Sequence, residues 1–195
     1  MNEIKNIISS AIDLNKLVLK NDILLSQIKI VSEVLTQCFE SGNKVMFCGN
    51  GGSAADAQHL AAEFSGKFYL DRKALPVEAL HCNSSYLTAV ANDYSYDLIY
   101  SRLLEGIGKK GDVLVGITTS GNSKNIINAF IKAKEIGIQT IALTGETGGE
   151  LKNHANLLIN IPSTDTPRIQ ESHILIGHII CYLVEKNLFE TIDNQ

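Results

Sequence analysis

Hydrophobic residues in the first 41 positions recur at the spacing expected of amphipathic helices. Over residues 2–41 they fall on one helical face, with an interruption at Asn21-Asp22 and a stop signal at Gly42. This pattern predicts two adjacent helices ahead of the first strand. Because these helices offer each other little apolar surface, we expect them to pack on the rest of the chain, on another subunit, or on both.

From residue 44 onward the pattern changes to short apolar runs separated by longer helical stretches. The runs are rich in Val, Ile and Leu without clean alternation, which is typical of strands buried on both faces. Their alternation with helices predicts an α/β fold with a five-stranded parallel sheet and right-handed crossovers. The expected strands are 44–48, 76–81, 113–118, 139–144 and 157–161. The expected helices are 53–66, 85–107 with a break near Asn92-Asp93, 123–136, 148–154 and 168–187.

Two segments rich in glycine and hydroxyl residues follow the first and third expected strands, at residues 49–54 and 118–123. Glycines allow tight turns close to a ligand, and the backbone amides at a helix start attract anions. Neither segment matches G-x-G-x-x-G or the Gly-Lys-Ser/Thr of a nucleotide loop. Parallel sheets bind ligands beyond the carboxyl ends of their strands, where both segments lie. The sequence therefore favours a small phosphorylated metabolite over a dinucleotide or a nucleoside triphosphate.

Helix capping is the alternative interpretation of both segments. Ser53 opens a Ser-Ala-Ala-Asp pattern that resembles a capping box, and Asn122 is a favourable cap for the helix that follows it. For the first segment, a purely structural turn and ligand binding remain equally open. In the second, one capping residue would suffice, so its excess of hydroxyls favours phosphate binding. Those hydroxyl residues are Thr118, Thr119, Ser120 and Ser123.

The composition limits which binding partners and which cellular compartment we expect for the protein. The 195 residues carry a formal net charge of −4 and no basic run longer than two, which argues against a broad nucleic-acid footprint. No apolar run of about 18 residues occurs, so we expect no membrane span. Four scattered cysteines without a CxxC pair are typical of reduced thiols in a cytoplasmic protein. A mean hydropathy of +0.07 is slightly apolar and suggests surface buried between subunits.

Acid–base and metal chemistry has candidates on two expected helices. His59 and Glu63 are four residues apart, so they share one helix face and could hold a divalent metal or act as a base with its neighbour. The alternative is a surface ion pair. At the same end of the sheet, Asp93 is a reasonable partner for a sugar hydroxyl, whereas we expect His81 to be structural.

The last helix carries Gln170, His173 and His178 within a mostly apolar stretch. Buried histidines are more often hydrogen-bonded in a core than catalytic. Gln170 and His178 are separated by about 12 Å along the helix axis, a long reach to one small ion. Either both side chains bend inward, or the two act in the sites of different subunits.

Three motifs together resemble the sugar isomerase (SIS) family, and within it the phosphoheptose isomerases. They are the Gly-Asn-Gly-Gly-Ser segment leading to His59, the Ser-Gly-Asn-Ser segment at 120–123, and Arg-Ile-Gln-Glu at 168–171 with His178. The resemblance covers nearly the whole chain. It implies a single domain over 1–195 with a three-layer αβα, flavodoxin-like fold, in which residues 1–42 form a helical pair that contacts neighbouring subunits.

The resemblance also implies an aldose–ketose isomerase that converts sedoheptulose 7-phosphate to D-glycero-D-manno-heptose 7-phosphate for bacterial lipopolysaccharide or capsule. Glu63 would move a proton between C1 and C2, and His178 would be the partner acid/base. Zinc would bind His59, Glu63, Gln170 and His178. Substrate would contact Asn50, Gly51, Gly52, Ser53, Glu63, Asn92, Asp93, Thr118, Thr119, Ser120, Ser123 and Gln170.

One position departs from the family pattern: Pro167 stands where several relatives have Asp, so Asp165 or Thr166 would take over that substrate contact. The resemblance further implies a homotetramer with active sites at subunit interfaces. The main alternative is a non-catalytic SIS protein that binds a replication initiator or senses sugar phosphates. A third is an isomerase for another phosphosugar. The presence of both Glu63 and His178 favours the enzyme.

Overall fold

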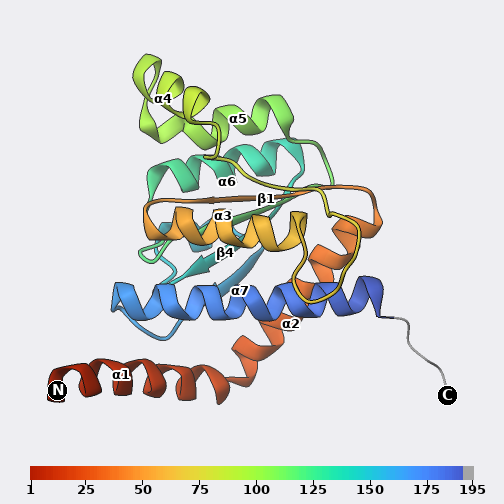
Figure 1. The fold of residues 1–195 in the computed structure, drawn as a ribbon. Helices are drawn as coiled ribbons and strands as arrows, with labels where there is room; N and C mark the ends of the chain where they lie inside the picture. The colour runs from red at the N-terminus through yellow and green to blue at the C-terminus, as the bar shows by residue number, and fades with distance from the viewer. Residues whose placement is uncertain (191–195) are drawn as a thin grey trace.

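The computed structural model describes residues 1–190, so the last five positions of the expected 1–195 domain lie outside the described residues. Five strands alternate with helices after a helical N-terminal segment (Figure 1). The strands are β1 (Val45–Gly49), β2 (Val77–Ala79), β3 (Val113–Ile117), β4 (Gln139–Thr144) and β5 (Leu157–Asn160). The helices are α1 (Asn2–Leu19), α2 (Asp22–Glu40), α3 (Gly52–Ser65), α4 (Ser84–Asp93), α5 (Ile99–Ile107), α6 (Lys124–Ile136) and α7 (Thr166–Phe189), with 3-10 turns η1 (Tyr96–Leu98) and η2 (Glu150–Asn153).

The five strands form one sheet in the order β2-β1-β3-β4-β5, and every neighbouring pair is parallel. The expected α/β fold is thereby confirmed. The chain leaves β1 in one direction for β2 and returns past β1 to β3, which makes the gap between the ends of β1 and β3 the topological switch point. In a sheet of this order, ligands bind at that point, beyond the carboxyl ends of the strands.

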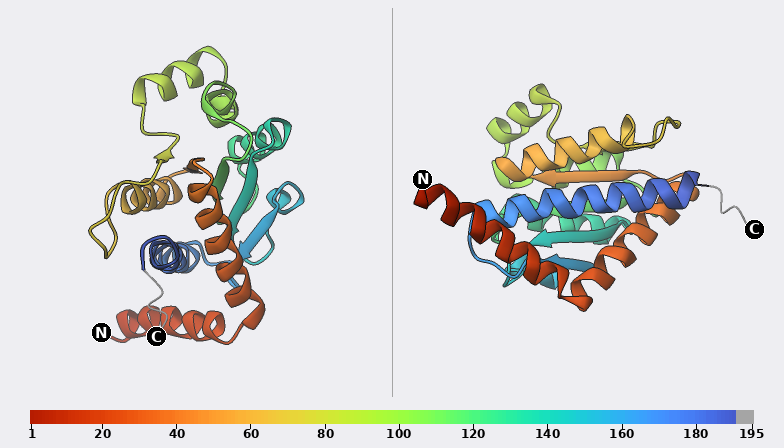
Figure 2. Two further views of the ribbon diagram at one scale, coloured as in Figure 1. Left: turned by 90° about the vertical axis from the view of Figure 1, so that its right-hand side faces the viewer. Right: turned by 60° about the horizontal axis from the view of Figure 1, so that its bottom comes forward.

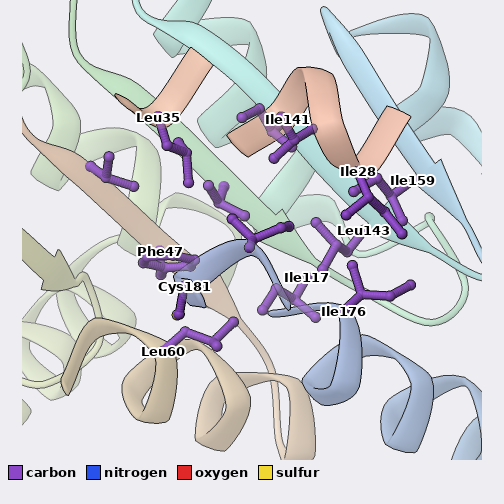
Figure 3. Packing of buried hydrophobic residues seen from close by; sticks show 14 of the residues in the cluster. Ile28, Leu35, Phe47, Leu60, Ile117, Ile141, Leu143, Ile159, Ile176 and Cys181 are labelled. Carbon is purple, nitrogen blue, oxygen red and sulfur yellow. The ribbon is translucent and has the colours of Figure 1, made fainter. Parts of the chain in front are cut away.

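Helices cover both faces of the sheet (Figure 2). On one face, α2, α3 and α7 pack against side chains such as Phe47, Val115 and Leu143. Figure 3 shows this core, with Leu60 of α3 and Ile176 of α7 meeting the sheet. On the other face, α4, α5 and α6 pack on the alternate residues of the same strands. Burial of both faces explains why the strands show no alternation.

The N-terminal helices differ in how they pack. Asn21 accepts a hydrogen bond from the backbone N–H of Leu24 and so caps α2, whose apolar face lies on the sheet and α7. In contrast, α1 buries only Leu14 and Val18 and leaves many apolar side chains in solvent. Those exposed residues are Ile4, Ile7, Ile8, Ile12, Leu17 and Leu19.

Several boundaries differ from the sequence expectation. The second strand is only three residues long, because it lies at the sheet edge with a single neighbour. The expected helix at 148–154 is a short 3-10 turn. The expected 168–187 helix begins earlier, at Thr166, since a proline is well tolerated in the first helical turn. Among residues 1–190, no helix is both long and apolar enough to cross a membrane.

Candidate active site

The segment 49–54 turns sharply from β1 into α3 at the switch point. Gly51 has a positive φ of 56° and serves as the N-cap of α3. A Cβ on Gly49 would lie 2.3 Å from the carbonyl oxygen of Ser53, so the turn has room only for glycine there. The capping-box alternative for this segment is wrong: Ser53 lies inside the helix, is buried, and makes no capping bond. The N–H groups of Ser53, Ala54 and Ala55 donate to backbone carbonyls of the turn, and α3 starts at the switch point without a side-chain cap.

The segment 118–123 lies on the other side of the switch point, between β3 and α6. Thr118 Oγ1 and Ser123 Oγ are 3.1 Å apart and share a hydrogen bond. Ser123 is the N-cap of α6 but makes no side-chain capping bond, and Asn122 instead accepts a hydrogen bond from the N–H of Glu150. Capping therefore does not account for the hydroxyls of this segment. They lie beside the positive end of a helix dipole, which suits an anion.

His59, Glu63 and His178 meet in one group, which we call the acid–base cluster. His59 Nε2 lies 3.0 Å from Glu63 Oε1 and 3.4 Å from His178 Nε2. The ligand atoms of all three lie within 4.8 Å of one another. Ligands of a tetrahedral zinc ion, at its usual bond lengths, are about 3.3 Å apart. The cluster therefore fits a divalent metal by both its donor atoms and its spacing.

Gln170 does not lie with the acid–base cluster in this chain. Its side-chain amide lies against Gly52 at the start of α3, where an added Cβ would be 2.6 Å from Gln170 Nε2. Because α3 and α7 run side by side, Gln170 is near one end of the pair and His178 is about 12 Å further along α7. Gln170 thus lies beside the 49–54 segment at the start of α3.

A buried ion pair holds the loop after α3 against α7. Arg72 Nε donates to Glu185 Oε1 at 2.9 Å, and the two side chains are 3% and 2% exposed. The same carboxylate accepts backbone hydrogen bonds from Phe68, Tyr69 and Leu70. Burial alone would raise the pKa of Glu185, but these hydrogen bonds outweigh it and lower the pKa.

This Arg72–Glu185 clamp reaches both helices of the cluster. Arg72 Nη2 donates to the backbone carbonyl of Glu63 at 3.0 Å. The ring of Phe68 lies 5.6 Å from that of His178. Sequence reasoning missed the clamp, because its members are 113 positions apart and neither has a local signature.

The remaining candidates occupy different places. Asn92 Nδ2 donates to Asp93 Oδ1 at 2.9 Å, and both are exposed at the end of α4. Asp165 caps α7 only with its backbone, so its carboxylate is not used as a cap. Burial lowers the pKa of His81, whose Nδ1 has no partner among the described residues. Burial also raises the pKa of Asp56, one turn before His59, against the opposing effect of that histidine.

The sequence profile of the SIS domain matches residues 11–145. The chain belongs to the SIS domain family. It is 56% identical over 182 residues to a phosphoheptose isomerase of Clostridium acetobutylicum, and the match covers 93% of each chain. A phosphoheptose isomerase structure from Francisella tularensis has a TM-score of 0.91 at 34% identity, covering 95% of this chain and 97% of that one. One from Neisseria gonorrhoeae has a TM-score of 0.89 at 39% identity, covering 95% and 98%.

These matches confirm the family and the fold expected from the motifs. The SIS domain of this chain has its two glycine and hydroxyl segments at the switch point and its acid–base cluster on the α3–α7 pair. The two segments can bind an anion, and the acid–base cluster can move protons or hold a metal. Together they supply what a sugar-phosphate isomerase needs.

Proposed function

We propose that this SIS protein is an aldose–ketose isomerase that converts sedoheptulose 7-phosphate to D-glycero-D-manno-heptose 7-phosphate. The observation that carries the proposal is the meeting of Glu63 and His178, 115 positions apart in sequence, in one cluster with His59. A protein that only bound sugar phosphates would need the segments 49–54 and 118–123, here called the anion-binding segments, but not a carboxylate and an imidazole placed together. The phosphoheptose isomerases that match over most of the chain support the same activity.

Isomerisation moves one proton between C1 and C2 of the sugar through an enediol. In the proposal, the carboxylate of Glu63 takes the proton from one carbon and returns it to the other. His178 exchanges protons with the carbonyl and hydroxyl oxygens at the same two carbons. Glu63 Oε1 faces His59, while Oε2 accepts no hydrogen bond from the described residues and is available to the substrate. Reaction needs no redox cofactor, because the sugar is neither oxidised nor reduced overall.

We propose zinc as the metal of the cluster, held by His59, Glu63 and His178 with Gln170 as a fourth ligand. The support is the donor set and the spacing of the three clustered residues. When bound, zinc would act as a Lewis acid that stabilises negative charge on the sugar oxygens. Binding of Zn²⁺ measured by calorimetry on the metal-free protein, with His59→Ala as the comparison, tests this assignment independently of activity.

The site is proposed to be shared between protomers of a homotetramer. Glu63 follows Gly52 by eleven positions, or about 16 Å along α3, which exceeds the length of a seven-carbon chain. Gln170 likewise lies beside Gly52, where the phosphate would bind, and away from the cluster of its own protomer. A neighbouring protomer could bring its acid–base cluster to the start of α3, where the phosphate would bind. Glu63 would then reach the sugar, and Gln170 would lie beside the cluster of that neighbour. The exposed isoleucines of α1 supply apolar surface for such contacts.

The finer assignments concern the pathway and the compartment. We propose that the heptose product serves lipopolysaccharide or capsule synthesis in the bacterial cytoplasm. The four cysteines are all free, as is usual in a reducing compartment. Restoration of heptose in the lipopolysaccharide or capsule of a bacterium that lacks its own isomerase would test the pathway.

Turnover of sedoheptulose 7-phosphate by the purified protein tests the activity directly. We expect wild type to form the aldose, and Glu63→Gln to lower kcat by at least about 100-fold while the protein remains folded. The amide keeps the shape of the side chain but cannot accept the proton. Absence of turnover by wild type, with or without added zinc, would show a binding module instead. Turnover of a different phosphosugar in a substrate panel would correct the substrate alone.

A further inference from the structure

Two asparagine side chains join the 49–54 segment to the start of α6, directly after the 118–123 segment. Asn50, in the segment after β1, donates from Nδ2 to Asn125 Oδ1 at 2.9 Å. Asn125, in the first turn of α6, donates from Nδ2 to Asn50 Oδ1 at 2.8 Å. The two amides therefore form a reciprocal pair that spans 75 positions of sequence. This pair directly connects the start of α6 with the turn that leads into α3.

The surroundings leave this amide pair one arrangement. Asn125 is 2% exposed, and its Oδ1 also accepts the backbone N–H of Ile126 at 3.0 Å. The hydroxyl of Tyr96 donates to Asn50 Oδ1 at 2.9 Å. Reversing either amide would bring donor against donor, so both orientations are determined. A buried amide that lost its partner would remain unsatisfied, which gives the pair a firm preference for this geometry.

These contacts change the role expected for Asn50. Its side-chain oxygen already accepts two hydrogen bonds, and its nitrogen donates one to Asn125. The side chain is therefore occupied by contacts to α6 and η1, which leaves it a structural role. We propose that Asn125, together with Asn50 and Tyr96, is a positioning device that sets the spacing of the two segments so that both bind one phosphate.

Tyr96 links the device to η1, and a separate hydrogen bond outside the device joins η1 to α6. Tyr96 belongs to η1, which follows the Asn92-Asp93 break, and Asn128 of α6 donates to the backbone carbonyl of Asp97 in the same turn. Asn128 lies one helical turn beyond Asn125 and makes an amide hydrogen bond of similar length, 3.0 Å, without contacting either anion-binding segment. It therefore provides a matched control. Replacing either asparagine by alanine would weaken the packing of α6, but only Asn125→Ala would change the spacing of the two anion-binding segments.

The test compares Asn125→Ala with Asn128→Ala, using inorganic phosphate as the probe. We expect Asn125→Ala to raise the inhibition constant of phosphate and the KM for sedoheptulose 7-phosphate by about tenfold, because both hydrogen bonds of the amide pair are lost, together with the one from the Ile126 N–H. Its kcat should fall less than its KM rises, since the acid–base cluster is not touched. Asn128→Ala should leave both constants within about twofold. Equal effects of the two variants, or an unchanged phosphate constant in Asn125→Ala, would overturn the proposal.

Tyr96→Phe keeps the test decisive if Asn125→Ala does not fold. Tyr96 is 51% exposed, so removal of its hydroxyl leaves the core unchanged, and we expect a smaller rise of the phosphate constant, about two- to threefold. An unchanged phosphate constant in Tyr96→Phe would count against the device. The inference rests on the proposed sugar-phosphate function, but the two fail differently. If wild type neither binds phosphate nor isomerises the sugar, the proposed function is wrong. If wild type does both and the variants do so equally well, only the positioning role is wrong.

Discussion

Two histidines of α7 show how burial separates structural from chemical roles. His173 is fully buried, and its Nε2 donates to the backbone carbonyl of Thr144 at 3.1 Å. Burial lowers the pKa of His173 to about 4, against the smaller opposing effect of that hydrogen bond. His178, five positions later, faces His59 and Glu63 instead. The structural role expected for a buried histidine thus applies to His173.

The lowered pKa of His173 predicts how stability depends on pH. Between about pH 6.5 and 4 the unfolded chain binds a proton at His173 that the folded chain does not, so the free energy of unfolding falls as pH falls. The contribution is at most about 3 kcal/mol across this window. Chemical denaturation at several pH values should show a flatter dependence for His173→Gln than for wild type. Parallel curves for wild type and His173→Gln would contradict the assignment.

At the scale of elements, the pairing of α3 with α7 decides whether the acid–base cluster forms. Gly177 lets the helices approach, since a Cβ there would lie 2.6 Å from the side chain of Leu60. The Arg72–Glu185 clamp then holds the far end of the pair. Gly177 directly precedes His178, and Arg72 donates to the backbone carbonyl of Glu63. The geometry of the cluster therefore depends on residues with no chemical role of their own.

Breaking the clamp should be costly, because it leaves a charge buried without its partner. We expect Glu185→Gln to lower the free energy of unfolding by about 3 kcal/mol, measured by urea denaturation. Glu135→Gln, which removes a partner of the exposed pair with Lys132, should cost less than about 1 kcal/mol. Similar losses in the two variants would mean that the clamp contributes no more than a surface pair.

At the scale of the whole molecule, the separation of Gln170 from His178 and the proposed homotetramer together predict complementation between inactive subunits. Gln170→Ala and His178→Ala should each lose activity alone. If the proposed tetramer is refolded from an equal mixture, about a quarter of the sites will combine an intact Gln170 with an intact cluster, so about a quarter of wild-type activity should return. A mixture of His59→Ala with His178→Ala should remain inactive, because both belong to one protomer's cluster. No recovery in the first mixture would place the complete site within one protomer.

Much of the fold was predictable because its signals are local. The strands and most helices follow from the spacing of apolar residues, and the break at Asn92-Asp93 coincides with the end of α4. Errors arose where short-range patterns compete. Ser53 does not cap α3, because Gly51 adopts the positive φ that starts the helix two residues earlier. The edge strand was overestimated, since apolar content alone does not show how many neighbours a strand has.

The sequence by itself determined the parallel α/β fold, the position of the two glycine and hydroxyl segments after β1 and β3, and the shared helix face of His59 and Glu63, because each depends on residues only a few positions apart. The tertiary structure decided that His178 joins that pair while Gln170 does not. It also decided that Asn50 pairs with Asn125, and Arg72 with Glu185. These contacts join residues from 75 to 119 positions apart. Such distances are closed only when the sheet and its covering helices assemble, so no local pattern encodes them.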